Sequence, residues 1–191
     1  EMSRQTTLLT SHKGVDLHAA SAVLVMKDRL EGGDRLAALH RCEMHTWWGD
    51  PAGVTMQRVL DTGRYFNPNK HHYGHFAVEG PVWDSPRGGA FVETWPGDVV
   101  ATDLEDLAGD RDALYGRLLG GAVPEGHHAV DVAAWSRDQE GPVYSGVLWR
   151  LVVAGDADDA HRTGEGLAVA RSRKEGLLIN PHMEAWLSRV R

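Results

Sequence analysis

Residues 143–153 read Val-Tyr-Ser-Gly-Val-Leu-Trp-Arg-Leu-Val-Val. This stretch is short, rich in β-branched and aromatic residues, and apolar enough towards its end to be buried on both faces, which is typical of a central strand. Residues 129–135, Ala-Val-Asp-Val-Ala-Ala-Trp, have the same character. The two segments predict a β-sheet at the centre of the fold.

Shorter β-prone runs lie earlier in the chain and are separated by Pro and Gly, which predicts further strands. These runs cover residues 76–78, 90–95 and 99–101.

Apolar residues at helical spacing predict three helices and, after Gly32-Gly33, a second N-terminal helix that begins at Asp34 and continues through Leu36, Leu39 and His40. The three helices are expected within 16–29, 103–119 and 158–171. Because helices and strands do not alternate strictly, we expect an α+β fold. Its helical N-terminal third is followed by a mainly antiparallel sheet with packed helices, and residues 1–191 form a single domain.

The composition narrows the functional classes. The chain has 191 residues and a formal net charge of −7, which argues against nucleic acid as the main partner. No apolar run approaches the roughly 18 residues needed to span a bilayer, so no membrane partner is expected. The lone Cys42 excludes an internal disulfide and a Cys-based metal site. We therefore expect a cytoplasmic protein, and the excess of Arg over Lys favours a bacterial source.

Two Asn-Pro pairs predict capped helix starts, at Asn67 and at Asn180. After the second pair, apolar residues at helical spacing predict a short terminal helix. These residues are Met183, Trp186, Leu187 and Val190. This helix either docks on the core or presents free backbone N–H groups to an anion, with Asn180 and His182 beside them.

Eleven His and seven Trp are unusual for a chain with three Phe and four Tyr. The densest polar cluster follows Asn67, and in it His71, His75 and Glu79 are spaced four apart. In a helix, His71 and His75 could share one divalent metal ion, and the ligand set would then be His71, His75 and Glu79. In a strand they would stand about 13 Å apart, too far for one ion, and the β-prone residues after Gly74 favour a strand.

Two other interpretations of this cluster remain. It is a solvated loop, or it is a metal-free site for an acidic small molecule, in which Asn67, Asn69 and Lys70 bind the ligand and His72 or His75 transfers a proton.

Further candidates lie outside this cluster. His127 and His128 precede the strand at 129–135 and could act as additional acid–base groups if the two segments are neighbours. Trp47 and Trp48 could line a pocket or simply pack against the core. No phosphate-binding loop, dinucleotide motif or nucleophile elbow is present in the sequence.

The sequence therefore predicts a small enzyme that acts on a polar or anionic small molecule through a His-rich site, by hydrolase, lyase or isomerase chemistry. The cofactor is not identified by the sequence, and a divalent metal is one option. The alternative is a non-catalytic binding or assembly protein with a partner surface of Trp and His, and homo-oligomers are compatible with either function.

Overall fold

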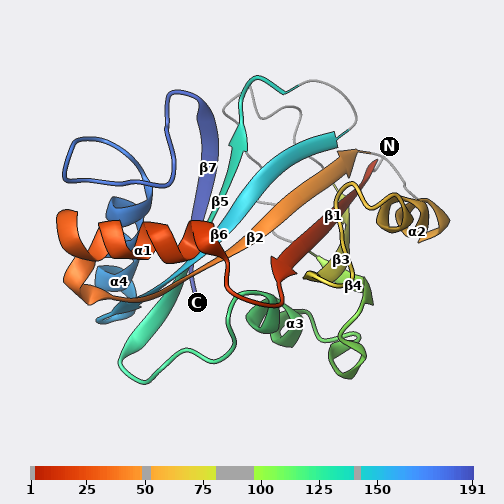
Figure 1. Cartoon of the computed structure of the whole chain (residues 1–191), viewed down its shortest axis with the longest axis horizontal. Helices are drawn as coiled ribbons and strands as arrows, with labels where there is room; N and C mark the ends of the chain where they lie inside the picture. Colours follow the sequence, from red (N-terminus) through yellow and green to blue (C-terminus); the bar gives the residue numbers. More distant parts are fainter. Residues whose placement is uncertain (1–2, 49–52, 81–96, 140–142) are drawn as a thin grey trace. The chain divides into compact units, whose positions relative to one another are not determined.

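The computed structural model describes residues 3–48, 53–80, 97–139 and 143–191. Within these residues the chain forms four α-helices, two short 3-10 helices and seven strands (Figure 1). In chain order these are β1 (Ser3–His12), α1 (Leu17–Arg29), η1 (Gly33–Arg35), β2 (Leu36–Trp48), α2 (Gly53–Asp61), β3 (His71–Gly80), β4 (Asp98–Thr102), η2 (Glu105–Leu107), α3 (Arg111–Leu118), β5 (His127–Ser136), β6 (Val143–Ala154), α4 (Ala157–Ala168) and β7 (Glu184–Val190). No helix among the described residues is long and apolar enough to cross a membrane.

The strands pair in the order β4-β3-β1-β2-β6-β5-β7. The pairings of β1 with β2 and β3, of β3 with β4, and of β5 with β7 are antiparallel. The expected α+β class is therefore confirmed. Strand β6 lies between two other strands, and its residues 148–153 are all buried, as its apolar sequence predicts.

The chain divides into two compact units, and each is assembled from separated stretches. The first contains residues 1–14, 42–121 and 138–146, and the second contains 15–41, 122–137 and 147–191. The expectation that residues 1–191 form a single domain stays a prediction.

In the first unit β1 lies between β2 and β3 (Figure 1). Its side chains alternate between the two faces, so neighbouring Leu8 and Leu9 enter different layers. Leu8 packs with an apolar cluster from α2 and the segment that follows it. On the other face of β3, Gly74 lets α3 approach closely, because a Cβ there would lie 2.9 Å from the Leu114 side chain.

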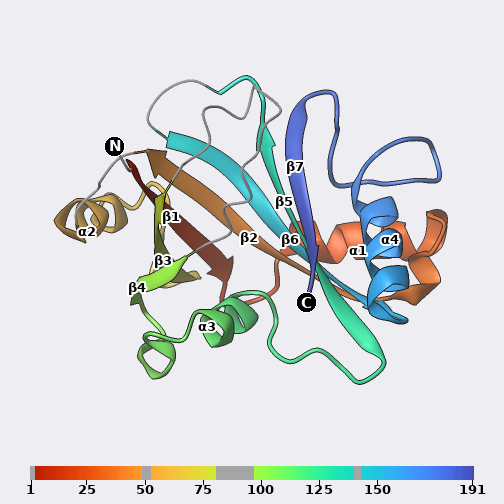
Figure 2. The same ribbon diagram turned by 180° about the vertical axis from the view of Figure 1, so that it is seen from behind.

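In the second unit α1 and α4 lie next to each other in both views (Figures 1 and 2). Their buried faces join one apolar cluster with side chains of β5, for example Met26 and Leu167 with Val130. Asp16 caps α1 by accepting hydrogen bonds from the backbone N–H groups of His18 and Ala19.

The predicted second N-terminal helix is wrong. Asp34 lies in the short η1 turn, and strand β2 begins at Leu36. The i, i+3, i+4 spacing of a few apolar residues cannot distinguish helix from strand, whereas the period-2 burial farther along is decisive. Cys42, Met44 and Thr46 are buried, and the residues between them are partly exposed. The N-terminal third is therefore not helical, because β1 and β2 flank α1.

The predicted terminal helix is also wrong, because residues 184–190 form β7. Asn180 does accept a hydrogen bond from a backbone N–H, that of His182 at 3.0 Å, but this bond closes a turn and not a helix. Trp186 then pairs with Ala134 of β5. An Asn-Pro pair therefore marks a turn before a strand here.

Smaller differences concern helix lengths. The segment 103–119 contains η2 and α3 with Gly109 between them at a φ of 81°, and the helix predicted over 158–171 ends at Ala168. Helix α2 was not predicted, and the strand predicted over 90–95 lies outside the described residues.

Candidate functional site

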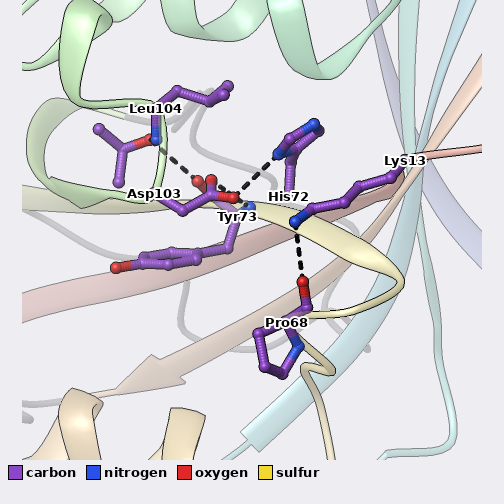
Figure 3. Close-up of polar contacts among 7 residues, drawn as sticks. Lys13, Pro68, His72, Tyr73, Asp103 and Leu104 are labelled. Atoms are coloured by element: carbon purple, nitrogen blue, oxygen red, sulfur yellow. Dashed lines mark hydrogen bonds and ion pairs between the residues drawn. The ribbon is translucent and has the colours of Figure 1, made fainter.

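His72 and Asp103 form a hydrogen-bonded pair in the first unit (Figure 3). The imidazole Nδ1 of His72 lies 2.9 Å from Oδ2 of Asp103, and the backbone N–H of Tyr73 donates to Oδ1 at 3.0 Å. The carboxylate only accepts, so it favours the tautomer with the proton on Nδ1 and leaves Nε2 as the basic nitrogen. The side chains of His72 and Asp103 are 34% and 23% exposed.

Asp103 is positioned by the end of β4. The hydroxyl of Thr102 donates to the backbone oxygen of Tyr73 at 3.1 Å and accepts from the backbone N–H of Leu104 at 2.9 Å. These bonds fix the chain on both sides of Asp103 (Figure 3). The carboxylate is therefore held against β3 before any ligand binds.

Cationic and hydroxyl groups lie at the same end of β1 and β3. Ser11 is the direct cross-strand partner of His72, so its side chain lies on the same face of the sheet. Lys13 donates its backbone N–H to the backbone oxygen of Lys70 at 2.8 Å, and its ammonium group donates to the backbone oxygen of Pro68 at 2.8 Å. Both lysines are exposed, which makes this end of the two strands favourable for an anion.

His71 lies on the opposite face of β3 from His72, because neighbouring strand residues alternate. Its Nδ1 accepts the backbone N–H of Asn67 at 3.0 Å, and its ring packs edge-on against His12 with centroids 5.0 Å apart. Burial, and then the nearby His12, lower the pKa of His71 below its ordinary value. His71 is thus a neutral hydrogen-bond acceptor that holds the preceding turn.

The other predicted ligand groups of this segment have different surroundings. The side-chain oxygen of Asn67 accepts the backbone N–H of Asn69 at 2.9 Å, so this oxygen is used inside the turn. Asn69 and Lys70 are exposed and remain accessible to a ligand. His75 is only 2% exposed, so a ligand in solvent does not reach it.

The structure does not provide the helical spacing that a shared metal ion requires. His71 and His75 both lie in strand β3, where residues four apart are separated by about 13 Å. The side chain of Glu79 lies outside the described part of the chain. Among the described residues, no group of three His, Cys, Asp or Glu side chains is arranged to hold a metal ion.

Trp47 packs within the first unit. Its ring lies edge-on to Tyr65 with centroids 5.6 Å apart, and His45 contacts the same tyrosine at 4.6 Å. Burial is the main cause that lowers the pKa of His45. The side chain of Trp48 lies outside the described residues.

The remaining predicted residues belong to the second unit. The structure does not bring the pair His127 and His128 together with the pair Asn180 and His182. The Nδ1 atoms of His127 and His128 lie 3.0 and 2.9 Å from the backbone oxygens of Glu125 and Gly155. Asn180 and His182 lie in the turn before β7.

The register between β5 and β7 separates these groups. Ser136 at the far end of β5 pairs with Glu184, whereas Val130, near His128, pairs with Val190. At about 3.3 Å per residue, the strand length places the two histidines roughly 25 Å from the turn of Asn180.

A pocket of about 370 Å³ opens on the Tyr73 face of the first unit. Its lining includes Gln57, Leu60, Asp61, Phe66, Pro68 and Tyr73. Burial, and then the Asp103 carboxylate, raise the pKa of Tyr73 above its ordinary value, so its phenol stays neutral. The pocket and His72 therefore lie on opposite faces of β3.

Sequence reasoning selected His72 but missed Asp103, Ser11 and Lys13. Asp103 lies 31 residues from His72 in sequence, and it occurred in a segment with helical spacing. The one local signal was an acidic residue two positions after the predicted strand 99–101, which in the structure ends at Thr102. Ser11 and Lys13 become relevant only through the pairing of β1 with β3.

Comparison of the chain with protein-family models, with curated proteins and with solved structures found no match.

Proposed function

We propose that this protein is a small enzyme in which His72, oriented by Asp103, transfers a proton to or from a polar, anionic small molecule. The observation that carries the proposal is the 2.9 Å contact between His72 Nδ1 and Asp103 Oδ2 at a partly exposed position. Hydrolase, lyase and isomerase reactions all use such a group.

The carboxylate supports proton transfer in two ways. It holds the imidazole in one orientation, and it stabilises the imidazolium that forms when Nε2 takes a proton. Tyr73 and Thr102 keep the carboxylate in place, so the pair needs no rearrangement during the reaction. A correctly positioned acid–base group of this kind contributes about 10²- to 10⁴-fold in rate.

The preference for an anion rests on the neighbouring charges. Lys13 and Lys70 are joined by a backbone hydrogen bond at the end of β1 and β3, and both side chains are exposed. Their ammonium groups suit a carboxylate or phosphate on the substrate. The buried lone Cys42 fits a reducing cytoplasm as the working compartment.

Turnover of a panel of sugar phosphates and short hydroxycarboxylates, followed by mass spectrometry, tests the proposal. We expect at least one compound to be converted, and His72→Gln to lower the rate by about 10²- to 10⁴-fold. His18→Gln, at an exposed position of the second unit, is the matched control and leaves the rate unchanged. Conversion that survives His72→Gln, or no conversion in either compound class, contradicts the proposal.

An assembly role is the second candidate function. Trp47 packs against Tyr65, so a Trp-rich partner surface has little support, but the first turns of α1 and Val15, two residues before the helix, expose apolar side chains. Leu17 and Leu24 are 75% and 70% exposed and lie seven residues apart, on one side of the helix. Light scattering of the wild type and of Leu24→Glu tests this role, which predicts oligomers that the substitution dissociates.

A further inference from the structure

We propose that the pocket on the Tyr73 face binds a small organic cation, an amine attached to a flat or apolar body. The pocket has a volume of about 370 Å³, at the small end of the range for ligand sites. It lies on the opposite face of β3 from His72, so it is distinct from the proposed acid–base site.

The walls of the pocket are aromatic and held in place. Phe66 and Tyr73 meet edge-to-face with centroids 4.9 Å apart, and Phe66 is only 8% exposed. Phe66 also packs into the cluster of Leu8, Met56 and Leu60 beneath it. Rings fixed in this way offer a preformed surface to an apolar body, and their π-faces attract a cation.

The rim is fixed as well. Pro68 lines the pocket, and its backbone oxygen accepts a hydrogen bond from the ammonium group of Lys13 at 2.8 Å. The turn that contains Pro68 is closed by the side chain of Asn67, which accepts from Asn69 at 2.9 Å. A ligand therefore meets a rim that is already ordered, and binding requires little loss of loop entropy.

The charge of the pocket selects a cation. Asp61 is the charged residue among the described residues that line it, and the Lys13 ammonium group at the rim is bound to the backbone oxygen of Pro68. Gln57 donates to Oδ1 of Asp61 at 2.9 Å, and no ion pair joins Asp61 to a described residue. Asp61 is also the last residue of α2, where the helix dipole favours positive charge and a carboxylate adds to the negative end. An ammonium group near Oδ2 of Asp61 would interact favourably with the carboxylate and with the negative end of the α2 dipole.

Three matched probes test this inference: phenethylamine, which is cationic at pH 7, neutral 2-phenylethanol and anionic 3-phenylpropionate. Binding to the full chain is followed by the amide NMR signals of Gly63 and Tyr73. We expect saturable shifts, with the amine bound about three- to tenfold more tightly than the alcohol, and the anion bound most weakly.

Two variants locate the effect. Asp61→Asn at its exposed position removes the charge, and it is expected to reduce the affinity for the amine to that for the alcohol. Phe66→Leu keeps an apolar core residue but weakens both probes. Asp28→Asn, at the end of α1, is the matched control and changes neither.

Three outcomes overturn the inference. They are the absence of saturable shifts at Gly63 and Tyr73, equal affinity for the amine and the alcohol, and an amine affinity that Asp61→Asn does not change. None of them depends on whether His72 proves to be catalytic, so the two proposals fail separately.

Discussion

Asp103 and Asp131 each accept two side-chain or backbone hydrogen bonds within a β-rich unit, but they differ in partner and in burial. Asp131 on β5 is 0% exposed and accepts from Nε and a terminal nitrogen of Arg150 at 2.7 and 2.9 Å. Arg191 approaches the second oxygen to 3.3 Å. Asp103 is 23% exposed and contacts an imidazole and one backbone N–H.

The difference teaches which carboxylate can take part in chemistry. A guanidinium keeps its proton at any physiological pH, so the pair of Asp131 and Arg150 only holds the fold together. An imidazole can act as an acid or a base, and the exposure of His72 lets a substrate reach it. The nature of the partner and solvent access, more than the hydrogen-bond distance, therefore distinguish a reactive aspartate from a structural one.

The largest expected effect is on the structural side. Asp131→Ala leaves the guanidinium of Arg150, which is 5% exposed, buried without its carboxylate. We expect the free energy of unfolding, measured by urea denaturation, to fall by about 3–5 kcal/mol. Asp28→Ala, at an exposed site, is the control and changes it by less than about 0.5 kcal/mol. A loss of stability below about 1 kcal/mol for Asp131→Ala would contradict the structural role assigned to Asp131.

For Asp103 we expect a small effect on stability and a large effect on the reaction rate. Asp103→Asn changes the free energy of unfolding by less than about 1 kcal/mol, because the pair is partly solvated. Turnover of the substrate found for the wild type is expected to fall by about 10²-fold or more, since the imidazole loses its orienting carboxylate. Urea denaturation and initial rates measured on the same preparation separate the two effects. A variant that loses stability and keeps its rate would place Asp103 among the structural residues.

Gly74→Ala tests whether the His72 face depends on the packing of α3. The added Cβ would lie 2.9 Å from the side chains of Leu114 and Phe76 and 3.2 Å from that of Leu118. We expect a loss of about 1–3 kcal/mol from overpacking, seen as a lower melting temperature. A variant as stable as the wild type would show that the ends of these side chains move aside freely.

The smallest expected effect is a pH dependence of stability. Burial lowers the pKa values of His45 and His71 in the folded state below their ordinary 6.5, so the unfolded chain binds more protons in mild acid. The stability that these residues contribute is complete above pH 6.5 and is lost as the pH falls through the folded-state pKa values. Melting temperatures between pH 7.5 and 5 are expected to fall, and His45→Gln is expected to reduce that fall. An unchanged slope in His45→Gln would assign the effect to other groups.

The sequence predicted the elements whose pattern is local. Strand β6 appears as a continuous apolar run, and α1 appears as a segment with apolar residues at helical spacing. The prediction of helices was wrong for β2 and β7. Apolar residues three and four apart occur there in strands, and pairing with distant strands determines the secondary structure. Strand β1 was missed because its buried Thr6, Thr7 and Thr10 look like surface residues in isolation.

In the candidate site, too, the residue with a local sequence signal was predicted and the residue placed by strand pairing was missed. His72 was predicted because it lies in the densest polar segment of the chain, but its partner could not be predicted from spacing alone. Asp103 reaches His72 only because β4 pairs with β3 in a register that aligns Thr102 with Gly74. His71 was predicted as a metal ligand, although its hydrogen bond to Asn67 gives it a local structural role.

The interleaved composition of the two units has a consequence for how the chain folds. The backbone passes from one unit to the other five times, so no single cut releases either unit whole. Pairing Ser3 with Gly80 closes a loop of more than 70 residues for the hydrogen bonds between β1 and β3. Such long-range closures raise the contact order, and folding is expected to take milliseconds to seconds. During synthesis β1 meets its partner β2 first, and its other edge stays unpaired until β3 has been made.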